Sequence, residues 1–370
     1  MAKLNSSNWG TSLAGKRIAL TGHSGFKGTW FTHLLTTLGA SVSGFALRPD
    51  RNQENLFFST HTDHIIHNSS RYGDIRDRSS LNSWLEAASP DLLFHFAAQS
   101  LVRQSYIDPV ETFDTNVMGT VNLLEMARRI PSLRAIIVIT SDKCYLNSNS
   151  GQSFCEDDPL GGEDPYSASK ASTELVTQSF RNSYGGSGPK VATARAGNVI
   201  GGGDWSSERL VPDLVRAITG KKTLVLRNPE SIRPWQHVLE PLRGYVLLAE
   251  ALLAGQDLLG ESPEGAWNFG PEESAHQSVH EIAKKMIGNW GEGEISTNSK
   301  KDTLSEATVL KLDISKAKEK LAFVPKISLD QAISLTVRWH QTFSARSEQA
   351  KHELEKQLRD YLHFTDGNLT

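Results

Sequence analysis

Tyr166 and Lys170 are the residues whose types and spacing most directly suggest chemistry, because they stand four positions apart at the start of a predicted helix. Side chains at that spacing share one face of a helix. A phenol with its ordinary pKa of about 10 is a poor base, and lowering that pKa by three units requires about 4 kcal/mol. An ammonium group about 4 Å away supplies roughly that amount at an effective dielectric constant of about 20. We therefore expect Tyr166 to transfer a proton with its pKa lowered by Lys170, although such spacing also arises by chance at exposed helix starts.

A hydroxyl, a carboxylate and an amine follow one another in Ser141, Asp142 and Lys143, at the end of a strand predicted over residues 135–141. Ligands of open α/β sheets bind at the carboxyl ends of the strands. These side chains could therefore offer a substrate one hydrogen-bonding group, one general acid and one general base. A surface turn is the alternative interpretation of Asp142 and Lys143.

Three glycines, Gly22, Gly25 and Gly28, follow the first predicted strand, and a helical pattern begins among them. Such a loop lets the backbone approach a pyrophosphate, whose charge is met by unpaired N–H groups and the helix dipole. Turns collect glycine for other reasons, so the spacing alone says little. Its position between the first strand and the first helix of a βαβ series predicts a dinucleotide site, whose nicotinamide would add positive charge near Tyr166.

The adenosine end of that site is less clear from the sequence. Asp74 and Ile75 follow the third predicted strand, where the carboxylate could accept a hydrogen bond from an adenine amine, although a solvated turn is an equally good interpretation. The second strand is followed by Leu47 and Arg48, without the acidic residue that usually binds the ribose hydroxyls in NAD enzymes. NADP therefore stays open beside NAD.

Short apolar runs alternate with helix-period segments through the first half of the chain, which predicts βαβ units and a doubly wound parallel sheet of the Rossmann type. The expected strands are residues 17–21, 41–47, 64–67, 92–97, 135–141 and 191–196, and the expected helices are residues 30–38, 80–87, 117–130 and 167–184.

After Gly197 this alternation ends, and a smaller mixed α/β substrate domain is expected. Apolar residues at helical spacing then predict C-terminal helices that pack on the body or in a dimer. The expected division is a flexible lead at 1–14, a dinucleotide-binding domain at 15–197 with a returning segment near 233–256, a substrate domain mainly at 198–345 and a helical tail at 346–370.

Composition excludes several classes of partner. The 39 basic and 42 acidic residues give a net charge of −3, without a broad charged surface for nucleic acid or anionic lipid. Cys144 and Cys155 are too few for a disulfide framework and lack the spacing of a zinc site, so we expect no metal and a reducing compartment. No run approaches the roughly 20 apolar residues that span a membrane, and residues 1–15 lack the apolar core of a secretory signal. A cytoplasmic location is expected.

Several long motifs, in order, resemble the sugar-nucleotide branch of the extended short-chain dehydrogenase/reductase superfamily, and within it the CDP-glucose 4,6-dehydratases. The resemblance runs from about Gly15 to Trp339. Its motifs are the glycines at 22, 25 and 28 with the intervening residues, residues 95–99, Asn116 with the four residues after it, residues 141–145, Tyr166 with Lys170, and residues 195–205 and 233–238.

The resemblance implies that NAD is the cofactor and that CDP-glucose is converted to CDP-4-keto-6-deoxyglucose, a deoxysugar precursor for polysaccharide such as O-antigen. Tyr166 would remove the O4 proton while hydride leaves C4, and the 4-ketone would acidify the C5 proton. Related dTDP-glucose dehydratases carry an Asp-Glu pair at the strand end, whereas this chain has Lys143 in the second position. Lys143 would then be the C5 base, and Asp142 would protonate the departing C6 hydroxyl.

The resemblance also nominates binding residues and a homodimer or higher oligomer. Cofactor contacts fall to Gly22, His23, Gly25, Phe26, Lys27, Gly28, Asp74, Ile75, Ala97, Ala98, Gln99, Asn116, Tyr166 and Lys170. Substrate contacts fall to Asn198, Arg209 and Arg233, with His237 nearby. Gln99, Arg103 and Ser105 lie just beyond the fourth predicted strand and could contact the sugar. Guanidinium groups suit diphosphate oxygens, although Arg209 and Arg233 could be ordinary surface residues. A sugar-nucleotide 4-epimerase and a catalytically silent cofactor-binding regulator remain as alternatives.

Overall fold

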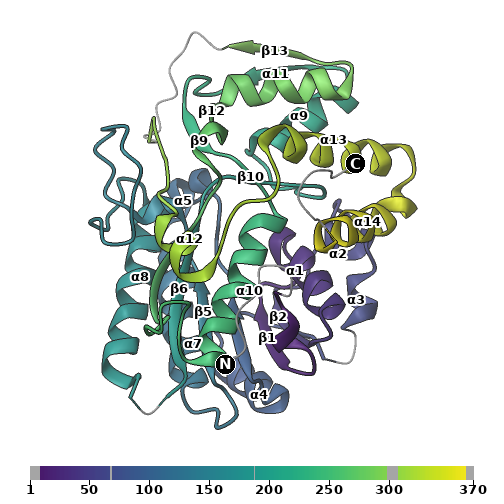
Figure 1. Ribbon diagram of the computed structural model, residues 1–370. Coiled ribbons are helices and arrows are strands. Elements are labelled where there is room, and N and C mark those ends of the chain that lie inside the picture. Colours follow the sequence, from purple (N-terminus) through teal and green to yellow (C-terminus); the bar gives the residue numbers. More distant parts are fainter. Residues whose placement is uncertain (1–8, 67–68, 187, 298–306, 364–370) are drawn as a thin grey trace.

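The computed structural model describes residues 9–66, 69–186, 188–297 and 307–363. Its centre is a seven-stranded sheet of parallel strands in the order β3-β2-β1-β4-β5-β6-β11 (Figure 1). The strands are β1 (Arg17–Thr21), β2 (Ser41–Ala46), β3 (Arg71–Tyr72), β4 (Leu92–His95), β5 (Ala135–Ile139), β6 (Lys190–Ala196) and β11 (Gly265–Phe269). This order confirms the predicted doubly wound, Rossmann-type sheet.

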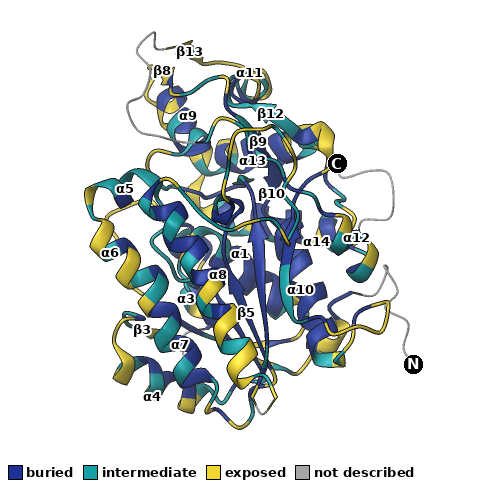
Figure 2. Ribbon diagram, turned by 90° about the vertical axis from the view of Figure 1, so that its left-hand side faces the viewer, coloured by how far each residue is buried: buried dark blue, intermediate teal, exposed yellow. Residues whose placement is uncertain are grey.

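Helices cover both faces of the sheet, because its central strands are apolar on both sides. Ile18 and Leu20 of β1 join the core beneath α1 (Phe26–Thr37) and α10 (Leu239–Ala254), whereas Ala19 joins the core on the opposite face. That opposite face carries α4 (Arg78–Ala88), α7 (Gly119–Ala127) and α8 (Pro165–Tyr184). In Figure 2 these three helices bury their inner sides and expose their outer sides.

The third strand lies later in the chain than predicted. Residues 62–65 form helix α3 (Thr62–Ile65) in place of the strand expected at 64–67, and residue 67 lies outside the described residues. The buried Thr62 hydroxyl hydrogen-bonds the His33 ring over 2.9 Å, which fixes this turn against α1. The actual strand β3 is two residues long and polar, so it has no apolar run to reveal it. The edge strand β11 was also absent from the predicted set.

The second half of the chain builds a smaller region above the sheet in Figure 1. It holds three two-stranded sheets, pairing β10 with β7, β12 with β9 and β13 with β8. Its elements are β7 (Val199–Ile200), α9 (Leu210–Thr219), β8 (Thr223–Leu226), β9 (Ile232–Pro234), β10 (Gln236–His237), η4 (Glu273–Ala275), β12 (His276–Ser278), α11 (Val279–Trp290), β13 (Glu294–Thr297) and α13 (Leu329–Ala345). The remaining elements are η1 (Thr11–Leu13), α2 (Leu56–Ser59), α5 (Val102–Ile107), α6 (Pro109–Phe113), the π-helical η2 (Asp114–Met118), η3 (Asp142–Cys144), α12 (Ser315–Leu321), η5 (Ser347–Gln349) and α14 (Ala350–Leu362).

Residues 9–14 are packed rather than flexible, contrary to expectation, and residues 1–8 lie outside the described residues. Trp9 and Leu13 are buried, and the Gly10 amide donates to Glu250 over 2.9 Å. The Trp9 ring meets Tyr361 of α14 edge to face, with centroids 6.2 Å apart. The segment at residues 9–10 therefore packs against α10 and α14. Within the described residues, no helix has the length and apolar character needed to cross a membrane.

Candidate active site

A cavity of about 680 Å³ lies at the carboxyl ends of the central strands. Residues that follow β1, β4, β5 and β6 line it from below, and residues of α9, β8 and β9 line it from the smaller region. The sheet order reverses between β1 and β4, which is where open α/β sheets bind ligands.

The glycine-rich loop forms one wall and fits a dinucleotide. Gly22 has a φ of +73°, and a Cβ there would lie 2.8 Å from the amide nitrogen of Ala97. A Cβ at Gly28 would lie 2.1 Å from the Gly22 carbonyl oxygen. Gly25 is the N-cap of α1, so the first amides of that helix point toward the cavity end. Phe26 and Lys27 also line the cavity, as predicted.

His23 does not contribute its side chain to this wall, contrary to the prediction. Its ring is fully buried under the loop, 5.4 Å from the Phe57 ring, and it occupies the space that a Cβ at Gly44 would fill. It is not among the described residues that line the cavity. Burial lowers the pKa of His23 to about 4, so the ring is neutral near pH 7.

Asp74 and Ile75, which follow β3, line the cavity. Three hydrogen bonds from the Arg76 side chain, at 3.0, 3.0 and 2.6 Å, hold the pKa of Asp74 below its ordinary value. Arg48, which left NADP open, instead lies over the Tyr72 ring at 4.5 Å and is not among the described lining residues.

The loop after β4 brings Ala97, Ala98 and Gln99 to the cavity. Asn116 is buried behind that loop: its Oδ1 accepts from the Gln99 amide over 2.8 Å, and its Nδ2 donates to the Ser169 hydroxyl over 2.8 Å. Asn116 therefore connects the loop to α8 and is not among the described residues that line the cavity.

The predicted redox pair lies on α8, which begins at the cavity. The Ser105 hydroxyl accepts a hydrogen bond from the Tyr166 amide over 3.1 Å, so Ser105 orients the helix start instead of lining the cavity. Burial raises the pKa of Tyr166 to about 12, although the Ser141 hydroxyl and the Arg209 charge act to lower it. The expected lowering of the phenol pKa rests on Lys170 together with a charged nicotinamide; in the protein alone, burial outweighs the neighbouring charges.

Asp142 and the two lysines are also perturbed by burial. The Asp142 carboxyl accepts from the Ser141 hydroxyl over 3.0 Å through Oδ1, while its Oδ2 has no hydrogen-bond partner in the described part of the chain. Burial raises the pKa of Asp142, which favours the protonated acid. Burial also lowers the pKa values of Lys27 and Lys170 to about 8. Lys143 is half-buried and lines the cavity beside them.

The predicted substrate residues Arg103, Asn198, Arg209 and Arg233 also line the cavity. Arg209 donates to Asp204 and to Ser100, each over 3.0 Å, and Arg233 donates to the Ile232 carbonyl over 2.9 Å.

His237 is the exception among the predicted substrate residues. It is fully buried, with its ring 5.9 Å from Trp30, and burial lowers its pKa to about 3. It does not line the cavity among the described residues. His237 therefore belongs to the core, not to the substrate site.

Glu208 is a cavity residue that the sequence did not single out. Its carboxylate lies 3.9 Å from Arg103 and 3.9 Å from Arg227, so it connects the main body to the smaller region across the cavity. Nothing in the local spacing identifies it, because its partners are about 100 and 20 positions away. The sequence did not single out Asp204 either, although this residue lies within the motif at residues 195–205.

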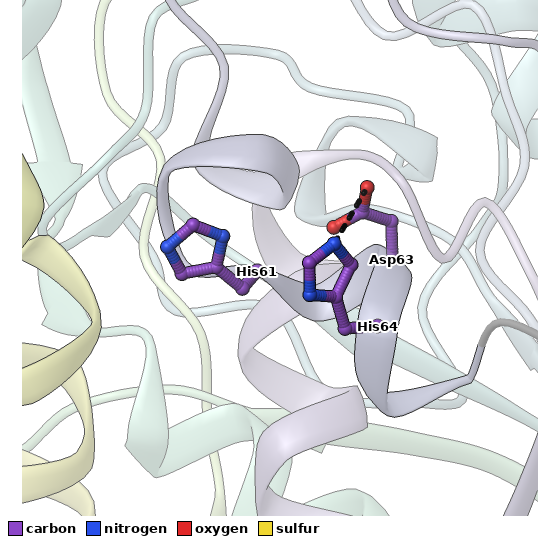
Figure 3. A group of neighbouring side chains, drawn as sticks. All are labelled: His61, Asp63 and His64. Carbon is purple, nitrogen blue, oxygen red and sulfur yellow. Dashed lines mark ion pairs between the residues drawn. The ribbon is translucent and has the colours of Figure 1, made fainter.

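One group in the described chain could hold a metal ion, away from this cavity. His61, Asp63 and His64 place their ligand atoms within 4.8 Å of one another (Figure 3). Both histidines are exposed, and Arg51 lies 3.6 Å from the Asp63 carboxylate, which opposes a cation there.

A tyrosine and a lysine facing a glycine-rich loop across one cavity, on a doubly wound sheet, define the extended short-chain dehydrogenase/reductase class. The chain belongs to the GDP-mannose 4,6 dehydratase family, whose model matches residues 20–336.

Three relatives illustrate the similarity. A CDP-glucose 4,6-dehydratase of Salmonella typhimurium is 42% identical over 95% of this chain and 97% of its own. A dTDP-glucose 4,6-dehydratase double mutant of Streptomyces venezuelae, solved with NAD bound, is 25% identical, with a TM-score of 0.73 over 88% of this chain and 97% of that one. An epimerase of Methanothermobacter thermautotrophicus shares the fold, with a TM-score of 0.75 at 21% identity over 92% of this chain and 96% of that one.

Proposed function

We propose that this protein is an NAD-dependent CDP-glucose 4,6-dehydratase, which converts CDP-glucose to CDP-4-keto-6-deoxyglucose. The 42% identity to the Salmonella enzyme over nearly the whole chain carries the proposal. The site agrees with it, because a dehydratase needs an acid and a base beyond the redox pair, and Asp142 and Lys143 line the same cavity as Tyr166.

The chain's own residues divide the reaction among them. Gly22, Gly25, Gly28 and Asp74 would hold NAD, which when bound supplies the hydride acceptor, the later hydride donor and a positive charge near Tyr166. Tyr166 accepts the O4 proton as the C4 hydrogen leaves as hydride. The resulting ketone acidifies the C5 proton, which Lys143 accepts, while Asp142 donates its proton to the C6 hydroxyl and water departs. Hydride returned to C6 and a proton to C5 complete the product without net oxidation.

The acid role of Asp142 follows from its environment. A carboxyl that is buried, with one oxygen unpartnered in the described structure, holds its proton to a higher pH than an exposed one. Arg209 and Arg233 sit where their charges can bind the diphosphate, and residues 224–228 line the cavity beside them. We include cytidine selectivity in the proposal on the strength of the relative's name.

The setting of the reaction belongs to the same proposal. We place the enzyme in the cytoplasm, in the supply of a deoxysugar precursor for O-antigen or a similar polysaccharide. Two free cysteines, Cys144 and Cys155, are consistent with a reducing compartment.

We also propose a homodimer. Exposed apolar side chains gather on α5, α6, η2 and α8, which contact one another: Ile107, Val110, Phe113, Met118, Leu175 and Tyr184. Exposed apolar side chains that gather on neighbouring helices favour an interface there.

A panel of sugar nucleotides tests the activity. Purified protein is incubated with NAD and with CDP-, dTDP-, GDP- or UDP-glucose or mannose, and products are followed by mass spectrometry. We expect loss of one water from CDP-glucose. Turnover of dTDP-glucose alone would contradict the substrate, and a product of unchanged mass would indicate a 4-epimerase. Bound NAD without turnover of any substrate would indicate a regulator.

A further inference from the structure

A buried ion pair lies on α8 one turn beyond Lys170, and the mechanism above does not use it. The side chains of Glu174 and Arg195 are only 4% and 3% exposed, and their charged atoms lie 2.9 Å apart. The Glu174 carboxylate accepts two hydrogen bonds from Arg195 and one each from the hydroxyls of Thr140 and Thr193. Burying an ion pair costs desolvation energy, so such a pair is weak evidence for stability alone.

The pair is connected to Lys170 through the end of β5. The Lys170 ammonium donates to the Ile139 carbonyl over 3.3 Å, and the next residue, Thr140, donates to Glu174. Lys170 and Glu174 are also four residues apart on α8 and share its face. The Lys170 ammonium and the Glu174 carboxylate therefore bind two consecutive residues, Ile139 and Thr140, at the end of β5.

Titratable groups from four elements lie around Lys170. Cys144 on η3 and His95 on β4 are neutral near pH 7, because burial raises the pKa of the thiol well above its ordinary value and lowers that of His95 to about 3. Lys27 on α1 is a second cation in the cavity. Burial lowers the pKa of Lys170 to about 8, and the negative charge of Glu174 acts most strongly in the other direction.

We propose that Glu174 is a positioning residue for the hydride-transfer steps: its carboxylate, fixed by Arg195, keeps the Lys170 ammonium charged and in place near Tyr166. The inference rests on the proposed function, since it assigns Glu174 to that reaction. Arg195 is in turn held by the Tyr145 hydroxyl, which accepts from it over 2.8 Å and donates to Asn268 over 2.7 Å.

The first test is the pH profile of dehydration in charge variants. Glu174→Gln removes the negative charge that favours the charged form of Lys170 and leaves the buried Arg195 without its carboxylate, so Lys170 should lose its proton more readily. We expect the alkaline limb of kcat to move to lower pH by about one to two units. The double variant Glu174→Gln/Arg195→Met removes one charge of each sign and should return the limb toward that of the wild type. Glu319→Gln, on the exposed side of α12, is the matched control.

The second test does not depend on turnover. Cofactor-free protein is treated briefly with acetic anhydride across a pH series, and acetylation of Lys170 is quantified by mass spectrometry. The labelling midpoint should fall in Glu174→Gln and recover in the double variant. If Glu174→Gln does not fold, Arg195→Met serves instead and should raise the midpoint, because it leaves the carboxylate unpaired.

The inference would be overturned if the labelling midpoint of Lys170 were unchanged in a folded single variant. It would also be overturned if the alkaline limb of kcat and the labelling midpoint of the double variant were the same as those of Glu174→Gln. Absence of dehydration by the wild-type protein would count against the proposed function instead, while the labelling midpoints would still decide the role of Glu174.

Discussion

Asp142 and Lys143 are neighbours in the chain but lie in different surroundings. The Asp142 side chain is buried beside Ser141 and Gly197, whereas Lys143 is half-buried at the cavity surface. Environment can assign opposite proton-transfer roles to adjacent groups. The buried carboxyl, whose pKa is raised, is suited to hold a proton for the leaving hydroxyl, and the more accessible amine is suited to receive one from C5.

Replacing Lys143 by Met should stop dehydration but not oxidation at C4. Loss of a general base costs about 10² to 10⁴ in rate. We expect dehydrated product to fall by that factor, while NADH absorbance still appears when CDP-glucose is added. Lys222→Met, on an exposed turn, is the control. Undiminished dehydration by Lys143→Met would refute its role as base.

Replacing Asp142 by Asn should lower activity and raise stability together. Because its pKa is raised in the folded state, folded protein holds this proton more tightly than the unfolded chain does. The free energy of unfolding therefore falls as pH rises from the ordinary Asp pKa of about 3.9 through the raised value. Removing the carboxyl should raise Tm at pH 7 by about 1 to 3 °C, with kcat reduced about 10² to 10⁴-fold. The gain in Tm should vanish near pH 4, and a Tm that falls at pH 7 would contradict this account.

Residues that follow strands were predictable from the sequence, and buried polar residues were not. Ser141, Asp142 and Lys143 were expected at the site because they end a strand, and they line the cavity. His23 and His237 sit within similar motifs, but their rings pack against Phe57 and Trp30. A motif fixes the position of a backbone, whereas the direction of a side chain depends on neighbours far away in the sequence.

At the scale of elements, short apolar runs correctly predicted the central strands, whereas the edge strand β3 was missed because it is polar. The strands β1, β4 and β5 lie at or near their predicted residues, because each is buried on both faces. The two-residue β3 is polar, and the apolar Ile65 and Ile66 beside it were mistaken for its strand. Whether such a pair forms a strand or a helical turn is decided by contacts such as the one between Thr62 and His33, which no local pattern records.

The glycine-rich loop requires glycine for two different reasons, which are ligand approach at Gly25 and backbone packing at Gly28. A Cβ at Gly25 would lie 3.5 Å from the nearest atom outside its neighbours, which is ordinary contact, whereas one at Gly28 would overlap the loop backbone. We expect Gly25→Ala to keep its Tm but to bind NAD at least about 10-fold more weakly, because a methyl group there meets the pyrophosphate. Gly28→Ala should lower Tm as well. Calorimetric titration with NAD and thermal unfolding would measure both, and equal Tm losses would contradict the distinction.

At the scale of the molecule, the cavity depends on segments that join the sheet to the smaller region. The turn at 201–203 is clamped between two helices: Trp30 of α1 donates to the Gly202 carbonyl over 3.0 Å, and a Cβ at Gly202 would meet the Trp339 ring of α13. This turn leads into Asp204 and Arg209, which line the cavity. Helix α13 therefore helps place the Arg209 guanidinium at the cavity, although this helix does not itself line the cavity among the described residues.

The exposed surface of α8 leads to a prediction about the oligomeric state of the protein. Leu175 is 55% exposed on the face opposite the buried Glu174 side, amid the apolar residues assigned to the dimer interface. A charge placed there would be desolvated in a dimer but solvated in a monomer. We expect the wild-type protein to sediment as a dimer and Leu175→Glu to shift it toward monomer with its far-ultraviolet circular dichroism unchanged. Leu259→Glu, 54% exposed on a turn outside this helical surface, should leave the dimer intact. A wild-type protein that sediments as a monomer at micromolar concentration would exclude this interface, and dissociation by both variants would show that the effect is not specific to α8.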